Sequence, residues 1–302
     1  PTLEGAGVHL RRAFGFGDTS ELDPFLLFDD FRNEIPAHYA KGFPWHPHRG
    51  IETITYVLAG TVDHGDSLGN EGTLGAGDVQ WMTAGSGILH QEMPKGDASG
   101  RMHGFQLWAN LPSNLKMTTP RYQDVTSKEI PEVTDDDGTR VRVICGDFWG
   151  KTGPVVGIAS GPRYLDVWVP PGKRKTLPAE AARNTFAYVF EGAATLGDGE
   201  APAARGHLAV LEREGDGLRI AAGEAGARVL LVAGKPIGEP VARHGPFVMN
   251  TRAELETAFN DYRRTQFGGW PWDGPDPTHG HEDRRFARHA DGRIEYAATA
   301  GV

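Results

Sequence analysis

Two pairs of residues that can bind a metal constrain the fold of this chain more than any other feature. In each pair a single residue separates the two members. His46 and His48 lie in FPWHPHRG, and His90 and Glu92 lie in GSGILHQEMP. In a β-strand successive side chains point to opposite faces, so residues two apart project from the same face. Two such strands facing each other would form a four-ligand metal site.

The segments around these pairs have the composition of strands. Residues 51–58 (IETITYVL) are rich in β-branched and aromatic types, and Gly60 closes the run. Glycines at short intervals between the two pairs indicate short strands joined by tight turns, which is typical of a barrel. Because the 302 residues include 41 glycines and 21 prolines, we expect an all-β fold of two barrels rather than a helical or doubly wound fold.

The donor atoms of the two pairs narrow the choice of metal. Three imidazoles and one carboxylate suit divalent iron, manganese, nickel, copper or zinc, and the sequence has neither paired cysteines nor a carboxylate-rich cage. Among these metals we favour iron. Four protein ligands would leave an octahedral ion two open positions, and an open coordination sphere indicates chemistry rather than a structural role.

Other residues are candidates for the wall of a substrate cavity. His103 and Gln106 in HGFQLWANL fall on opposite faces of a regular strand, so at most one of them points inward. Residues 43–45 (FPW) offer an apolar wall for an aromatic substrate. His279 and His281 are also two apart, but proline, glycine and charged residues surround them, so we predict a solvent-exposed tail there.

A break in composition divides the chain. Residues 128–138 (KEIPEVTDDDG) contain proline and three consecutive aspartates, which indicates an exposed connector. We therefore expect an N-terminal barrel with the metal site in residues 1–132 and a C-terminal barrel, helix and tail in residues 139–302. The second half repeats the alternating strands, but AARNTFA replaces HPHRGIE, so the second barrel has no metal ligands.

A helix is predicted near the C-terminus. Thr251 and Glu254 have the spacing of a capping box, and an apolar stripe follows them at helical intervals. Gly268 and Gly269 would stop the helix. We expect its apolar face to pack on a barrel.

Charge and composition exclude several classes of partner. The net charge of −9 at pH 7 would repel a phosphate backbone, so direct binding of nucleic acid is not expected. No membrane-spanning run or signal-peptide core opens the chain. Cys145 is the single cysteine, which excludes an intrachain disulfide and fits a reducing compartment. These features predict a cytoplasmic protein that does not bind membranes.

Several motifs together resemble the pirin family, a group of proteins with two cupin barrels. They are FPWHPHRGIETITYVLAG, GTLGAGDVQWMTAGSGILHQEMP, HGFQLWANLP and DPFLLFDDF, and the combination of HPHRG with GILHxEMP is the most specific. The resemblance implies that His46, His48, His90 and Glu92 bind the metal. It also implies that Glu52, which stands at a ligand position of the general cupin pattern, lies beside the ligands rather than on the metal.

The resemblance implies an activity as well. Some pirins are quercetin 2,3-dioxygenases, which open a flavonol ring and release carbon monoxide. For this chain we expect a flavonol-like aromatic substrate, dioxygen as second substrate, and Glu92 as the catalytic residue that accepts the substrate's proton. The alternative is a non-enzymatic, metal- or redox-responsive binding protein whose partner is a transcription regulator or a metabolic enzyme. In either role we expect a monomer.

Overall fold

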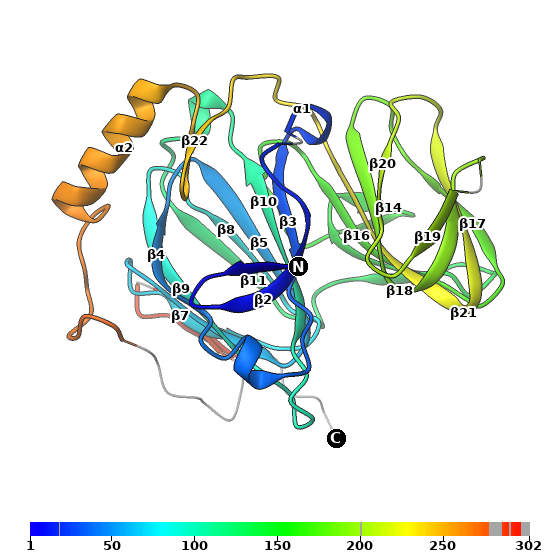
Figure 1. Cartoon of the computed structure of the whole chain (residues 1–302), viewed down its shortest axis with the longest axis horizontal. Coiled ribbons are helices and arrows are strands. Elements are labelled where there is room, and N and C mark those ends of the chain that lie inside the picture. Colours follow the sequence, from blue (N-terminus) through cyan, green and yellow to red (C-terminus); the bar gives the residue numbers. More distant parts are fainter. Residues whose placement is uncertain (18, 200, 278–285, 290, 297–302) are drawn as a thin grey trace. The chain divides into compact units, whose positions relative to one another are not determined.

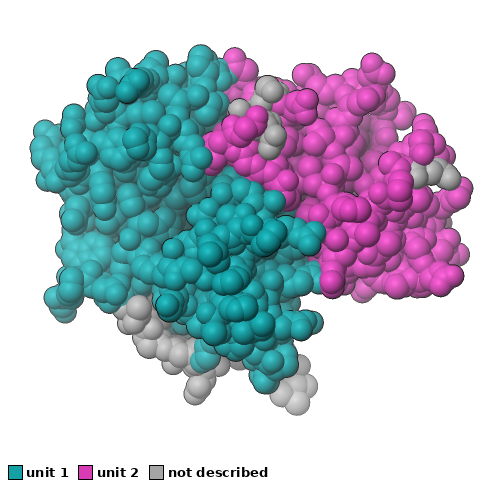
Figure 2. Space-filling model, in the orientation of Figure 1, with its two compact units in different colours: residues 1–12, 27–128, 239–302 teal, residues 13–26, 129–238 magenta. Residues whose placement is uncertain are grey.

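The computed structural model describes residues 1–17, 19–199, 201–277, 286–289 and 291–296 (Figure 1). Contacts group the chain into two compact units (Figure 2). The first unit comprises residues 1–12, 27–128 and 239–302, and the second comprises residues 13–26 and 129–238. His279 and His281 lie outside the described residues.

This grouping differs in two places from the single boundary that we expected between residues 132 and 139. Residues 13–26 belong to the second unit because Phe14 and Phe25 pack edge-on against Phe186, with ring centroids 5.2 and 5.5 Å apart. Residues 239–302 belong to the first unit, which also contains His46, His48 and His90.

Two antiparallel sheets build the barrel of the first unit (Figure 1). In spatial order, the described strands of one sheet are β1 (Thr2–Glu4), β2 (Val8–Phe14), β3 (Phe25–Asp30), β10 (His103–Asn110), β5 (Ile51–Ala59), β8 (Val79–Thr83) and β11 (Arg121–Val125). Those of the other sheet are β25 (Ile294–Tyr296), β24 (Phe286–Arg288), β7 (Glu71–Leu74), β6 (Thr61–Asp66), β9 (Ile88–Lys95) and β4 (Phe43–His48). The predicted strand over residues 51–58 is β5, which pairs with β10 and β8 and is almost entirely buried.

The second unit is also a barrel of antiparallel strands. Its described strands are β12 (Glu132–Thr134), β13 (Arg140–Cys145), β14 (Asp147–Phe148), β15 (Lys151–Thr152), β16 (Arg163–Val169), β17 (Arg174–Pro178), β18 (Asn184–Leu196), β19 (Ala201–Ala204), β20 (Leu208–Leu211) and β21 (Gly217–Gly234). Aliphatic side chains such as Val143, Leu165, Val189 and Ile220 fill its core. Among the described residues of this unit, no three potential ligands cluster with metal-binding spacing.

The predicted C-terminal helix is α2 (Arg252–Thr265), and both hydrogen bonds of its capping box are present at Thr251 and Glu254. A second, short helix is α1 (Thr19–Leu22), and single 3-10 turns cover Pro36–His38 and Ser113–Leu115. Leu255 and Ala258 of α2 pack on the hairpin of β22 (Ala242–His244) and β23 (Phe247–Met249).

The helix ends earlier than the two glycines that we expected to stop it. Gln266 and Phe267 already have left-handed φ angles of 46° and 53°, and the ring of Phe267 stacks on the Arg49 guanidinium, 4.4 Å from its centroid. None of the described helices is long and apolar enough to span a membrane.

Candidate metal centre

The three predicted histidine ligands come together on two neighbouring strands. β4 and β9 are antiparallel, His46 lies opposite His90, and His48 lies two residues farther along β4. The ring centroids are 4.4 Å apart for His46 and His90, 4.8 Å for His46 and His48, and 5.0 Å for His48 and His90. One potential ligand atom from each ring lies within 4.8 Å of the other two. The structure therefore brings His46, His48 and His90 together, and Glu92, the second member of the other pair, is not in this group.

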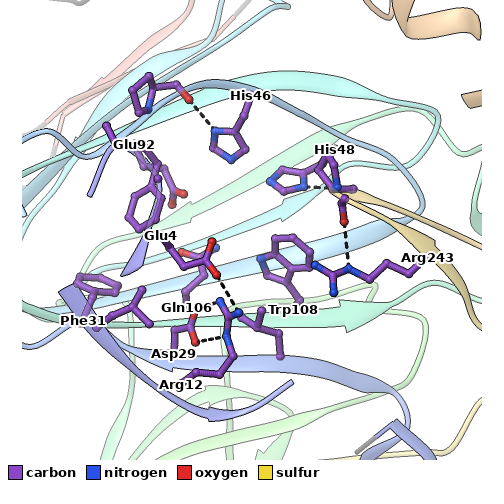
Figure 3. A pocket seen from close by; sticks show the side chains of 18 residues that line it. Glu4, Arg12, Asp29, Phe31, His46, His48, Glu92, Gln106, Trp108 and Arg243 are labelled. Atoms are coloured by element: carbon purple, nitrogen blue, oxygen red, sulfur yellow. Dashed lines mark hydrogen bonds and ion pairs between the residues drawn. The ribbon is translucent and has the colours of Figure 1, made fainter. Parts of the chain in front are cut away.

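Backbone carbonyl groups orient two of the rings. Nδ1 of His46 donates to the carbonyl oxygen of Pro44 at 2.8 Å, and Nδ1 of His48 donates to that of Pro246 at 3.4 Å (Figure 3). Because a carbonyl only accepts, Nδ1 carries the proton in both rings, and the Nε2 lone pair is left for a metal. Burial lowers the pKa of both imidazoles, and each is therefore neutral at pH 7, as a ligand must be.

His90 provides the test of whether the cluster fits a metal ion. Its side chain is 1% exposed, and neither ring nitrogen has a hydrogen-bond partner among the described residues. A buried polar group without a partner costs about 1–3 kcal/mol, so native proteins rarely contain one without a reason. Burial, and then the neighbouring His46 and His48, lower the pKa of His90 far below its usual value. A neutral, unpartnered imidazole facing two others is what a bound cation would require.

Glu92 lies in the same cavity, but its carboxylate is not part of the tight histidine group. Oε1 of Glu92 accepts a hydrogen bond from Oγ1 of Thr55 at 2.7 Å. Burial raises the pKa of Glu92 to about 7, although the bond from Thr55 acts in the opposite direction. The predicted role of Glu92 as fourth ligand therefore stays a prediction, and a carboxylate with this pKa is also suited to proton transfer.

A short hydrogen-bond chain holds Glu92 from the opposite sheet. Oγ1 of Thr55 lies 2.7 Å from Glu92 and 2.9 Å from the side-chain oxygen assigned to Gln106. A hydroxyl has one proton and cannot donate to both groups. If the amide of Gln106 is turned so that its nitrogen donates, the chain runs from Gln106 through Thr55 to an ionised Glu92.

Two residues near the site have partners outside the cavity. The carboxylate of Glu52 accepts a hydrogen bond from Oγ1 of Thr83 at 2.8 Å and is buried. His103 lies 3.3 Å from Nε of Arg32, whereas Gln106 lines the cavity, so the expectation that at most one of the pair His103 and Gln106 points inward is met by Gln106.

The cavity beside the histidines has a volume of about 490 Å³ and is lined by both apolar and charged side chains (Figure 3). The apolar wall includes Leu10, Leu27, Phe31, Phe43 and Trp108. Of the three residues 43–45 proposed as a wall, Phe43 and Pro44 line the cavity and Trp45 does not. The ring of Trp108 meets that of His48 edge-on at 4.9 Å.

Charged residues of the cavity come from three separate segments. Arg12 of β2 forms a two-point ion pair with Asp29 of β3 at 2.9 and 2.8 Å, and it also contacts Glu4 at 2.8 Å. Arg243, from the hairpin of β22 and β23, donates to the carbonyl of Gly245 at 3.1 Å. Sequence reasoning assigned these residues no role, and only the fold brings their segments together.

Gly50 explains part of the HPHRG motif. Its φ is +80°, and a Cβ atom at this position would lie 1.9 Å from the carbonyl oxygen of Val248. Only glycine allows β23 to cross so close to the histidine strand. Buried Lys116 reinforces the crossing, because its Nζ donates to the carbonyl oxygens of Gly50 and Val248 at 2.9 and 3.0 Å and to Oδ1 of Asn110 at 2.7 Å.

Comparisons with known proteins agree with this architecture. The sequence model described as Pirin matches residues 7–109, and that described as Pirin C-terminal cupin domain matches residues 164–268. The chain is 47% identical over 268 residues to a pirin-like protein of Caulobacter vibrioides, which covers 88% of this chain and 95% of the relative. It is 41% identical over 269 residues to the pirin of Homo sapiens, at 88% and 90% coverage.

A solved structure has the same fold. The crystal structure of quercetin 2,3-dioxygenase from Acinetobacter baumannii is similar with a TM-score of 0.81 and 36% identity, over 89% of this chain and 94% of that one. The prediction of two cupin barrels is thereby confirmed. Since both family models match and the relatives align over most of the chain, this protein belongs to the pirin family.

Proposed function

We propose that this protein is a metal-dependent oxidoreductase that cleaves a flavonol or a similar aromatic enol with dioxygen, as a quercetin 2,3-dioxygenase does. The observation that carries the proposal is the buried, unpartnered imidazole of His90 beside the Nε2 atoms of His46 and His48, at the end of an apolar cavity. The similarity to a quercetin 2,3-dioxygenase supports the reaction type. Iron is the metal that we favour, since dioxygen chemistry needs an ion with accessible redox states.

The three histidines would hold the metal, with Glu92 as the proposed fourth ligand. When bound, the metal would stabilise the ionised enol oxygen of the substrate and supply the redox chemistry for its reaction with dioxygen. The chain itself supplies binding and proton transfer. Trp108 and Phe43 offer flat and apolar surfaces for an aromatic ring, and the cavity volume of about 490 Å³ leaves space for a substrate of several rings.

Glu92 is the proposed acceptor of the enol proton once its carboxylate has left the metal. A general base works best when its pKa is near the working pH, and burial raises the pKa of Glu92 to about 7. The hydroxyl of Thr55 stabilises the ionised carboxylate and fixes its position. After the substrate enol is ionised, its proton stays on the Glu92 carboxyl group, whose protonated form is favoured by burial.

The test measures oxygen uptake and carbon monoxide release from quercetin by the iron-loaded protein. The proposal predicts equal amounts of both, and it predicts that Glu92→Gln lowers kcat at least about 100-fold with the protein still folded. Absence of turnover with every first-row metal would contradict the proposal for flavonols.

A metal-responsive binding protein is the second candidate, and one contact favours it. The hydrogen bond between His48 and the Pro246 carbonyl joins a proposed ligand to a hairpin whose residues Arg243, His244 and Gly245 are exposed. A change at the metal would therefore reach a surface through one hydrogen bond. The test measures how much of a protein partner is captured by the intact protein and by His48→Ala, with and without metal. Equal amounts in all four cases would argue against this candidate.

A further inference from the structure

Two side chains on the outer face of the metal-binding strands share one hydrogen-bond acceptor. Trp45 precedes His46 on β4, and Gln91 lies between the two predicted ligands of β9; neither lines the cavity. Nε1 of Trp45 donates to the carbonyl oxygen of Pro277 at 3.2 Å, and Nε2 of Gln91 donates to the same oxygen at 2.6 Å. A single backbone carbonyl thus joins β4 to β9 at the level of the histidines.

This carbonyl belongs to a segment, residues 270–277, that we call the C-terminal strap. The ring of Trp270 packs edge-on against Trp45, with centroids 4.6 Å apart. Nε1 of Trp272 donates to the carbonyl oxygen of Asp66 at 2.9 Å, and Asp66 lies opposite His90 in the ladder between β6 and β9. The strap therefore contacts three adjacent strands, β4, β9 and β6, behind the histidine cluster.

The strand that most needs such support is β4. Among the described strands it is the last of its sheet, and β9 is the one described strand that it pairs with. Its ladder with β9 also contains an irregularity between Phe43 and His46, directly before the first histidine. An edge strand with a bulge has few backbone hydrogen bonds to fix its position.

We propose that the C-terminal strap is a positioning element that sets the affinity of the metal centre by fixing the distance between β4 and β9. The inference rests on the proposed metal centre and adds a part to it. The strap lies beyond residue 268, where the match to the pirin C-terminal cupin domain ends. A small change in the spacing of the two strands would change the distance between the Nε2 atom of His46 and the nitrogen atoms of His90, and metal binding is sensitive to such changes.

The test uses the full chain with both donors removed and side-chain volume largely kept, as Trp45→Phe with Gln91→Leu. The matched control is Arg163→Gln, which removes the ion pair between Arg163 and Glu180 within the second unit. The affinity for Co(II) is measured by competition with a coloured chelator, and the Co(II) absorption bands report the ligand geometry. Trp272→Phe, which removes the donor to the Asp66 carbonyl and keeps the rest of the chain, serves as a second variant.

We expect the double variant to bind Co(II) about tenfold more weakly than the wild type, with shifted absorption bands, and the control to stay within about twofold. A merely structural strap would lower the unfolding midpoint of the metal-free protein and leave affinity and bands unchanged, which would overturn the inference. If the wild type itself binds no Co(II) or Fe(II), the metal centre is wrong and the inference falls with it. If the wild type and the double variant bind metal equally tightly, the metal centre stands and only the role of the strap is wrong.

Discussion

The substitution Glu92→Gln should change how the stability of the metal-free protein depends on pH. Glu92 is 6% exposed, and burial raises its pKa from 4.5 to about 7. Between these two values the folded protein keeps the proton while the unfolded chain has lost it. Because the folded state then binds more protons, the free energy of unfolding falls as pH rises.

The size of the loss follows from the two pKa values. The contribution of protonated Glu92 to the free energy of unfolding is complete below pH 4.5 and is lost as pH rises through about 7. The total loss is about 3 kcal/mol. Other groups act in the same range. Burial raises the pKa of Asp66 to about 6, so its titration also lowers the free energy of unfolding as pH rises. The buried histidines have lowered pKa values, so their titration raises the free energy of unfolding as pH rises. The difference between wild type and Glu92→Gln isolates the single carboxylate.

The assay is urea unfolding of metal-free protein at several pH values from about 4.5 to 8. The wild type should lose about 3 kcal/mol relative to Glu92→Gln across this range. Asp66→Asn is the matched control, since it should leave most of the loss between about pH 6 and 8 intact. Parallel plots of unfolding free energy against pH for wild type and Glu92→Gln would show that the Glu92 carboxylate has an ordinary pKa in the folded protein. That result would refute the reasoning.

Three further predictions concern neighbouring residues. Thr55→Val removes the hydrogen bond that favours ionised Glu92, so the pH midpoint of this stability loss should rise by about one pH unit; an unchanged midpoint would contradict the hydrogen-bond chain. Lys116→Met leaves three buried acceptors unpaired, so urea unfolding should show a loss of about 3 kcal/mol, and a loss under about 1 kcal/mol would count against this role. If Glu92 is a ligand, Fe(II) affinity should rise as pH increases through about 7, and the rise should be absent in Glu92→Gln; identical profiles would remove Glu92 from the metal.

Local patterns predicted the parts of the site that neighbouring residues in the sequence determine. The spacing of His46 and His48 predicted that both side chains project from one face of β4, because alternation is a property of any strand, and both line the cavity. Alternation does not fix a rotamer, so it did not indicate that the Glu92 carboxylate would lie against Thr55.

Contacts between distant segments were outside the reach of these patterns. The Pro246 carbonyl that orients His48, and Arg243, which lines the cavity, follow the histidine motif by about 200 residues. The capping box placed the start of α2 correctly, but its end depends on the packing of Phe267 against Arg49. Residues 13–26 belong to the second unit, where Phe14 contacts Phe186, which is distant in sequence.

The most direct test of the metal centre is an anomalous difference map from crystals of the protein, with data collected at the absorption edge of the metal it carries after purification without added metal. We predict a single strong peak within about 2.1 Å of one nitrogen of each of His46, His48 and His90, and a peak at the iron edge if our choice of metal is correct. An absence of any peak among the three rings in iron-supplemented crystals, or a peak at another site alone, would contradict the account.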